Sequence, residues 1–177
     1  MDLVEPINPV SSLQHKYILI ATDYFTRWVK VVPLILCNTS QVISFLENQI
    51  ITKFGTPEFL VFDIASYFQS IDLTIFTLEK GINLNFSANF YPQGNGLAES
   101  SNKNLISILK KTVASHHKKW GIQLYYSLWE DRITPKATLG NSPYFLLYGK
   151  EVVMAANLTI PSLQLAQSIQ ESDSSPL

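Results

Sequence analysis

The sequence predicts an α/β domain in which helices cover a mixed five-stranded sheet. Of the 177 residues, 46% are hydrophobic and 15% are charged, which supplies the apolar material for one core in a chain of this length. The first part of the chain shows three strand patterns in a row, and helix and strand patterns alternate after them. An antiparallel meander followed by β-α-β units produces a sheet with both parallel and antiparallel strands.

Three strands are expected within residues 1–34. The opening "MDLVEP" has a strand pattern, and "KYILIATD" at 16–23 is an apolar run that ends in polar residues. In "RWVKVVPL" at 27–34 the side chains alternate between two faces. Only "YFT" separates the second strand from the third, and a connection of that length predicts a hairpin.

A helix is expected over residues 38–55. Thr39 or Ser40 can cap its start, and Gly55 and Pro57 stop the pattern. Apolar residues recur at helical spacing at Val42, Phe45, Leu46, Ile50 and Phe54. This periodicity indicates one buried helical face.

The rest of the predicted domain alternates between short strands and helices. Strands are expected at 58–63 and 82–87, with a helix between them at 70–81 that Gly81 closes as a C-cap. Further helices are expected at 97–117, 120–132 and 142–148. Residues 1–150 are thus predicted to form the domain, and residues 151–177 to form a polar, flexible tail.

Charge, cysteine content and hydropathy exclude several classes of protein. The net charge is −1, so any site for a polyanion must arise from local clustering of cations. Cys37 is the single cysteine, which rules out an intrachain disulfide and a thiolate zinc cluster. The apolar runs are too short to span a membrane, and no signal peptide is recognised, so a reducing compartment is expected.

Three carboxylates occur where strands end or a helix begins. Asp2 lies in the first strand, Asp63 ends the strand at 58–63, and Glu99 opens the long helix; positions 64 to 98 separate the last two, a gap of 35 residues. Acids from two neighbouring strands and a helix can converge, and oxygen ligands suit Mg²⁺ or Mn²⁺. Two such ions catalyse phosphoryl transfer. The alternative for each acid is a helix cap or a solvated side chain.

Five segments, in order, resemble the catalytic core of integrases from retroviruses and Ty3/gypsy-type retrotransposons. They are "MDL…P", "TDYFTRWV", "FGTPEFLVFD", "NFYPQGNGLAESSNK" and "SPYFLLYG". The resemblance covers roughly residues 1–150 and includes the gap of 35 residues between the last two acids.

The resemblance implies a ribonuclease-H-like fold and a polynucleotidyl transferase that joins the 3′ ends of element DNA to target DNA. Its catalytic, metal-binding triad would be Asp2, Asp63 and Glu99, holding two Mg²⁺ or Mn²⁺ ions. Asp23 matches a strand-end position outside the triad. The implied partners are DNA and further copies of the chain, and the implied location is the nucleus, with the cytoplasm as the alternative.

The resemblance also implies DNA contacts along the long helix. Asn102 and Lys103 follow Glu99 at positions that contact the DNA end in integrases, and Lys110 and Lys111 continue the cationic face. The alternatives are an ion pair between Lys103 and Glu99, one helical turn apart, and a solvated face. A buried stripe is expected opposite these cations, at Leu105, Ile108, Leu109 and Val113.

Departures from the integrase pattern keep a second function open. Integrases have a polar residue and then glycine after the second acid, whereas Ile64 and Ala65 stand here. Asp2 is almost the first residue of the sequence, so its strand is expected to lack the usual lead-in and the core is expected to be truncated at its start. The zinc-binding and basic domains of full integrases are not recognised. The alternative is therefore a non-catalytic remnant that binds nucleic acid or another partner.

The helix at 120–132 carries a set of apolar residues with two interpretations. The set is Trp120, Leu124, Tyr125, Leu128 and Trp129. It is either a surface for self-association, as integrase cores use, or part of the core, and the core interpretation is favoured.

Overall fold

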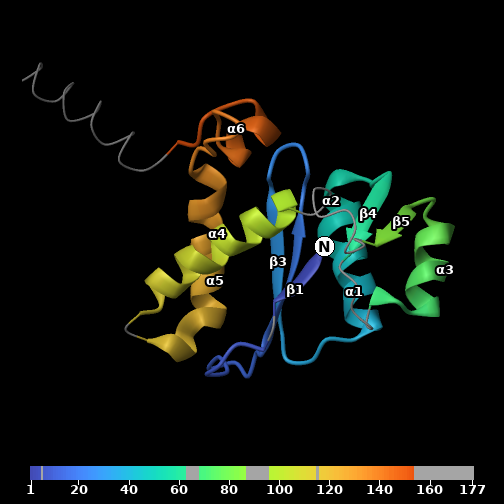
Figure 1. Cartoon of the computed structure of the whole chain (residues 1–177), viewed down its shortest axis with the longest axis horizontal. Coiled ribbons are helices and arrows are strands. Elements are labelled where there is room, and N and C mark those ends of the chain that lie inside the picture. Colours follow the sequence, from blue (N-terminus) through green and yellow to red (C-terminus); the bar gives the residue numbers. More distant parts are fainter. Residues whose placement is uncertain (5, 63–67, 87–95, 115, 154–177) are drawn as a thin grey trace, which may run out of the picture.

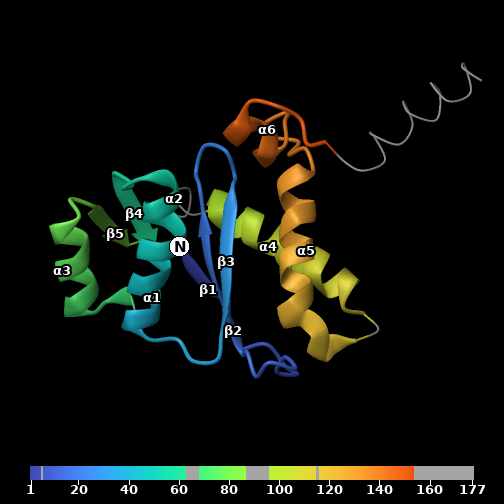
Figure 2. The ribbon, with the colours of Figure 1, turned by 180° about the vertical axis from the view of Figure 1, so that it is seen from behind.

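The computed structural model describes residues 1–4, 6–62, 68–86, 96–114 and 116–153, with only the backbone described at 97 and 98. Its elements are β1 (Asp2–Val4), β2 (Tyr17–Thr22), β3 (Val29–Leu34), α1 (Thr39–Phe45), η1 (Leu46–Ile51), α2 (Thr52–Phe54), β4 (Phe59–Phe62), α3 (Ile71–Glu79), β5 (Asn83–Phe86), α4 (Gly96–Thr112), η4 (His117–Lys119), α5 (Trp120–Ile133) and α6 (Pro143–Tyr148). The strands β1, β2 and β3 lie between α4 and α5 on one side and α1 on the other (Figures 1 and 2).

The first three strands form an antiparallel sheet in the order β1-β2-β3, as the meander predicted. Asp2 pairs with Ile20 across β1 and β2. The hairpin between β2 and β3 is closed by a hydrogen bond from the Asp23 amide to the Trp28 carbonyl at 2.9 Å. Pro33 lies in β3, which is the outer strand of this sheet, where its missing N–H is tolerated.

The two later strands form a separate parallel pair, β4 and β5, so the single five-stranded sheet predicted from the sequence is not observed as such. The two sheets touch where the amino group of Met1 donates a hydrogen bond to the carbonyl of Val61 in β4. β1 has only three residues, and a single hydrogen bond does not make a ladder between strands. The α/β fold class itself is confirmed.

One continuous helix runs through α1, η1 and α2, as predicted for residues 38–55. Its cap is Asn38, whose side chain accepts a hydrogen bond from the Gln41 amide at 3.0 Å. The prediction of Thr39 or Ser40 was wrong, because Asn38 has the extended backbone that an N-cap needs. Gly55 ends the helix with φ of +86°.

The helix α3 has the predicted termini. Ser70 caps its start by accepting a hydrogen bond from the Leu73 amide at 3.2 Å. Gly81 follows its end with φ of +69°, and its amide donates to the Leu78 carbonyl at 3.1 Å. This is the left-handed residue that commonly closes a helix.

Two apolar clusters cover the two faces of the sheet that contains β2. Leu19 packs into the cluster with α1 and α3, and its neighbours Ile18 and Ile20 pack into the cluster with α4 and α5. The buried residues of the first cluster are Leu19, Leu34, Val42, Phe45, Leu46, Leu60, Phe62, Phe68, Leu73, Phe76 and Ile82. Those of the second are Ile18, Ile20, Val29, Val31, Leu105, Leu109, Val113, Trp120, Leu124 and Leu128.

The apolar residues of α5, which were predicted to form either a self-association surface or part of the core, fall into a buried group and an exposed group. Trp120, Leu124 and Leu128 are buried, which confirms the core interpretation for these three. Tyr125 and Trp129 are 54% and 43% exposed, so the same interpretation is wrong for them. The division follows from helical geometry, because positions four apart share one face while their neighbours point elsewhere.

Arg132 joins α5 to β3. Its guanidinium donates to the Val29 carbonyl from Nε at 3.1 Å and from Nη2 at 2.7 Å. The guanidinium carbon also lies 4.1 Å from the ring centroid of Trp28. Burial lowers the pKa of Arg132 to about 10, although Tyr148 and Asp131 act in the opposite direction.

The predicted tail, residues 151–177, is described only as far as residue 153. Across the described ranges, no helix combines the length and the apolar character that a membrane span requires.

Candidate functional site

The side chain of Asp2 lies on the face of the sheet that α4 covers. Its neighbours Met1 and Leu3 pack on the opposite face, against the cluster that includes α1, and side chains alternate along a strand. Asn102 of α4 donates from Nδ2 to Oδ2 of Asp2 at 2.9 Å. This contact brings together two of the predicted site residues, which are a hundred positions apart in the sequence.

The amide of Asn102 is held by a second contact. Its Oδ1 accepts a hydrogen bond from Oγ1 of Thr22, at the end of β2, at 3.3 Å. Asn102 is only 6% exposed, so both ends of its amide are used inside the protein. The side chain therefore fixes one oxygen of Asp2 and ties α4 to both β1 and β2.

Sequence reasoning assigned Asn102 to DNA and missed its contact with Asp2. A signal was present, because Asn102 precedes Leu105 by three residues and Leu109 by seven. Residues at that spacing share one face of a helix. Asn102 thus continues the buried stripe that the sequence identified, and a buried amide needs partners inside the fold.

Glu99 lies one turn before Asn102 and faces solvent. Its side chain is 51% exposed, and its Oε2 is 3.9 Å from Nζ of Lys103. The Lys103 side chain is 82% exposed. The alternative interpretation of Lys103, an ion pair with Glu99, is therefore what the structure contains, and a pair this exposed contributes little to stability.

Asp63, the second acid of the predicted triad, lies outside the described residues. The strand β4 ends at Phe62, directly before it. Val61 of the same strand accepts the hydrogen bond from the amino group of Met1, next to Asp2. The chain that leads into position 63 is thus adjacent to the chain that carries Asp2.

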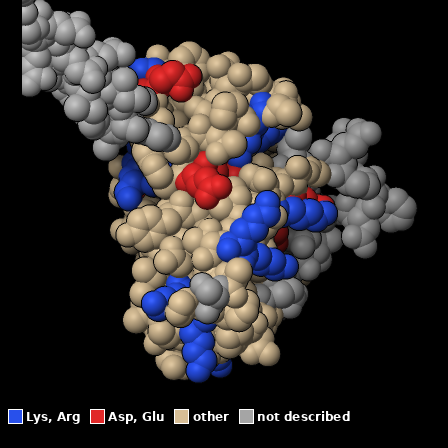
Figure 3. Space-filling view, turned by 90° about the vertical axis from the view of Figure 1, so that its left-hand side faces the viewer, with Lys and Arg blue, Asp and Glu red and all other residues tan. Residues whose placement is uncertain are grey.

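The cations that follow on α4 are exposed, as predicted. Lys110 and Lys111 lie in the last turn of the helix, where positive charge is favourable near the carbonyl end. Lys118 and Lys119 continue the exposed set beyond it. Figure 3, which views the molecule from the side of α4 and α5, shows Lys and Arg side chains spread over this face with acidic side chains between them.

Asp23 has a structural role, separate from Asp2. Its Oδ2 accepts hydrogen bonds from the amides of Phe25 and Thr26 at 3.1 Å and 2.7 Å, and from Oγ1 of Thr26 at 2.8 Å. These contacts organise the turn between β2 and β3. The carboxylate is therefore committed to the hairpin.

The donor set at Asp2 fits a hard divalent cation as far as it is described. Oδ2 of Asp2 accepts from Asn102, and Oδ1 takes no hydrogen bond from the described residues. Carboxylate oxygens are the ligands that Mg²⁺ and Mn²⁺ prefer. No three His, Cys, Asp or Glu side chains in the described ranges gather around a common point, and this does not test the triad because Asp63 lies outside those ranges.

Sequence comparison finds relatives among retroelement proteins. Gypsy retrotransposon integrase-like protein 1 of Rattus norvegicus is 27% identical over 154 residues, which is 85% of this chain and 28% of that protein. The Pol polyprotein of radiation murine leukemia virus (strain Kaplan) is 30% identical over 136 residues, which is 76% of this chain and 23% of the polyprotein. The chain therefore spans about a quarter of the length of these curated relatives. No protein-family model matches it.

Structure comparison finds a similar fold in a solved viral assembly. The structure is the simian T-cell lymphotropic virus intasome in complex with PP2A regulatory subunit B56 gamma, and the TM-score is 0.70. The match covers 86% of this chain and 56% of that chain, at 16% sequence identity. At that identity the similarity shows the fold alone.

Proposed function

Because this chain is related to the integrases of retrotransposons and retroviruses, we propose that it is the catalytic core of such an enzyme. The proposed reaction is a metal-dependent polynucleotidyl transfer that joins the 3′ ends of element DNA to target DNA. The proposed place of action is the nucleus, where the target DNA is found.

One observation carries this proposal, namely the hydrogen bond between Asn102 and Asp2 at 2.9 Å. It fixes the first turns of α4, including the exposed Glu99, beside the strand that carries Asp2. The hydrogen bond between Met1 and Val61 adds β4, the strand that leads into Asp63. These two contacts support convergence of the three carboxylates on one region.

The same contacts support a ribonuclease-H-like sheet. With β1 next to β4, the two observed sheets would form one mixed sheet in the order β3-β2-β1-β4-β5. The apolar clusters on its two faces match the predicted layering of helices over a central sheet. We propose this five-stranded arrangement for the complete core.

In the proposed enzyme, Asp2, Asp63 and Glu99 would hold a pair of Mg²⁺ or Mn²⁺ ions. Such a pair, when bound, activates the attacking oxygen and stabilises the leaving oxygen of a phosphoryl transfer. Glu99 is released for this role at little cost, because its pairing with Lys103 is long and exposed.

Four further residues of α4 have proposed roles at this site, either in orienting a carboxylate or in binding DNA. Asn102 holds Oδ2 of Asp2 and limits the rotation of that carboxylate, which preserves the positional precision that catalysis needs. Lys103, Lys110 and Lys111 are exposed on the same helix and would neutralise phosphates of the bound strand. Phosphate contacts of this kind set the register of DNA on the protein.

A strand-transfer and disintegration assay with Mn²⁺ tests the proposal. We expect Asp2→Asn, Asp63→Asn and Glu99→Gln each to reduce product formation to background. The matched control is Asp72→Asn, an exposed acid in the first turn of α3, and it should keep wild-type activity. If wild-type protein and Asp63→Asn give equal background, the enzymatic proposal is rejected.

A second function, a non-catalytic module that binds DNA, is favoured by the exposed lysines of α4. Lys110 and Lys111 are exposed, and neither belongs to the proposed metal site. Under this alternative, binding to DNA ends would not respond to Mg²⁺ or to Glu99→Gln. It would weaken in Lys110→Met/Lys111→Met, with a smaller salt dependence, but not in the exposed control Lys16→Met. Fluorescence anisotropy at several salt concentrations measures both effects.

A further inference from the structure

A cavity of about 590 Å³ lies on the face of the sheet opposite the side chain of Asp2. Its walls come from the β2–β3 hairpin, from η1 and from β4 and the residues just before it. Met1 lines the cavity, whereas Asp2, its neighbour on β1, bonds to α4 on the other face. The cavity is thus separate from the proposed catalytic site.

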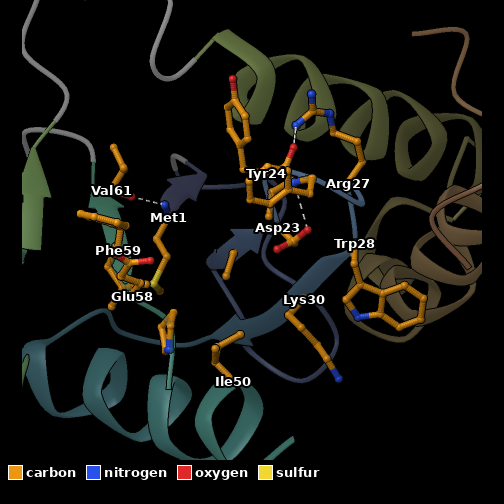
Figure 4. Close-up of a pocket in the computed structure, with 15 residues that line it drawn as sticks. Met1, Asp23, Tyr24, Arg27, Trp28, Lys30, Ile50, Glu58, Phe59 and Val61 are labelled. Atoms are coloured by element: carbon orange, nitrogen blue, oxygen red, sulfur yellow. Dashed lines mark hydrogen bonds between the residues drawn. The ribbon is translucent and has the colours of Figure 1, made fainter. Parts of the chain in front are cut away.

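The cavity has mostly apolar walls. Met1, Ala21, Ile50, Leu60 and Val61 are among the residues that line it. Figure 4 shows Met1 and Val61 on one side of this space and Ile50 on another. A volume of a few hundred cubic ångströms with apolar walls and few polar groups is typical of sites for small organic ligands.

Two of the charged residues in the lining have partners within the hairpin. Asp23 is bonded to the amides of Phe25 and Thr26. Arg27 donates to the carbonyl of Tyr24, and its guanidinium carbon lies 5.2 Å from the centroid of the Tyr24 ring. Asp23 is therefore committed to the hairpin, whereas the partners of Arg27 are a neutral carbonyl and an aromatic ring.

Lys30 is the half-buried cation of this wall, and its ammonium lacks an acidic partner in the described part of the chain. Nζ lies 5.2 Å from the ring centroid of Phe54. Burial, followed by the charges of Lys53 and Arg132, lowers the pKa of Lys30 to about 8. A negative charge beside this ammonium would offset both effects.

The acid that also lines the cavity does not compensate Lys30. Glu58 is exposed, and Figure 4 shows it beside Phe59 and Met1, across the cavity from Lys30. Among the described residues, neither Glu58 nor Lys30 forms an ion pair. The cavity thus combines apolar walls with the positive charge of Lys30, which no described acid pairs.

We propose that this cavity is a binding site for a small organic anion with an apolar body. The carboxylate or sulfonate of the ligand would pair with Nζ of Lys30, and its apolar body would contact Met1 and the side chains of β4. The site does not depend on the proposed catalytic function, because it uses neither α4 nor the three carboxylates.

The test compares an anionic probe with a neutral probe of similar shape. Anilinonaphthalene sulfonate and phenylnaphthylamine both become fluorescent in apolar sites, and Trp28 in the cavity lining allows energy transfer to be detected. Wild-type protein should bind each probe saturably at one site. Lys30→Met should weaken the sulfonate by about fivefold, the effect of one partly exposed ion pair, and leave the neutral probe unchanged.

Two further variants locate the binding site. Ala21→Leu adds bulk inside the cavity and should weaken both probes, whereas the exposed Lys16→Met should weaken neither. Circular dichroism checks that each variant is folded, and Lys30→Gln replaces Lys30→Met if that variant is not. The proposal is overturned if wild-type protein does not bind anilinonaphthalene sulfonate, or if Ala21→Leu binds both probes as tightly as wild type. It is also overturned if Lys30→Met and Lys16→Met have the same affinity for the sulfonate.

Discussion

Lys136 forms an ion pair with the fully buried carboxylate of Asp131, with 2.5 Å between Nζ and Oδ1. Asn104 of α4 donates to the same oxygen at 2.6 Å. Oδ2 of Asp131 is buried without a hydrogen-bond partner among the described residues. Within the described residues, the negative charge of Asp131 on α5 is thus compensated at Oδ1 only, by Asn104 of α4 and by Lys136, which follows α5.

We expect Lys136→Met to lower the free energy of unfolding by about 3–5 kcal/mol, because it leaves Asp131 as an unpaired buried charge. The double variant Asp131→Leu/Lys136→Met should recover most of that loss, since a well-packed apolar pair often replaces a buried ion pair without penalty. Urea unfolding of the two single variants and the double variant measures the coupling. Additive losses would show that the pair is not coupled.

The contact between Asn102 and Asp2 separates two roles for Asn102. If Asn102 orients Asp2, Asn102→Leu should lower Mn²⁺-dependent strand transfer while DNA affinity stays unchanged. Loss of the hydrogen bond should also reduce stability by about 1 kcal/mol, because Asp2 is only partly buried. Anisotropy and transfer assays on the same preparation provide the comparison. A parallel fall in affinity would instead support the DNA contact predicted from the sequence.

Local signals in the sequence were sufficient for most helices and for the first sheet. The helix before Gly55 and the helix between Ser70 and Gly81 have caps and apolar spacing that act within a few residues. The antiparallel order β1-β2-β3 followed from the meander, whereas the register of the strands was not predicted. These features depend on neighbours in the chain, so a single sequence contains them.

Features that depend on distant contacts were not predictable in the same way. The burial of Asn102 depends on partners in β1 and β2, although its helical spacing offered a signal. The exposure of Tyr125 and Trp129 depends on which face of α5 meets the sheet. The convergence of Asp63 with the other acids came from the resemblance and stays a prediction, because position 63 lies outside the described residues.

Gly121 is required by a close approach between α5 and the segment before β2. A Cβ at this position would lie 2.9 Å from Nδ1 of His15 and 3.2 Å from Cβ of Ser11. We expect Gly121→Ala to lower the free energy of unfolding by about 1–3 kcal/mol through overpacking. Gly96→Ala is the matched control, because a Cβ there meets no described atom within 4 Å. Equal stability of the two variants in thermal unfolding would contradict this packing.

The lowered pKa of Lys30 predicts a pH-dependent effect on stability. Between pH values of about 8 and 10.5, the unfolded chain binds a proton at Lys30 that the folded chain has lost. The free energy of unfolding therefore rises with pH across that window. Below about pH 8 both states are charged, and the penalty of burial is fully present. Lys30→Met should therefore be more stable than wild type at pH 7, and the difference should shrink by pH 10. Chemical unfolding at both pH values measures this difference in the free energy of unfolding between Lys30→Met and wild type. The same difference at pH 7 and pH 10 would refute the prediction.

The exposed aromatic residues of α5 provide a candidate surface for the self-association predicted from the resemblance. Tyr125, Tyr126 and Trp129 are 54%, 66% and 43% exposed on one helix. Exposed apolar patches of this kind mark interaction sites, because a second copy that covers them buries apolar surface.

We propose that two copies of the chain associate through this face of α5. In sedimentation velocity, wild-type protein should show a concentration-dependent shift towards a dimer, because covering the aromatic rings removes them from water. Tyr126→Lys should shift the equilibrium towards the monomer without changing the melting temperature. Ile71→Lys, at a 78% exposed position on α3, is the control and should leave the equilibrium unchanged. A wild-type monomer at all concentrations, or equal effects of the two variants, would exclude this face as the interface.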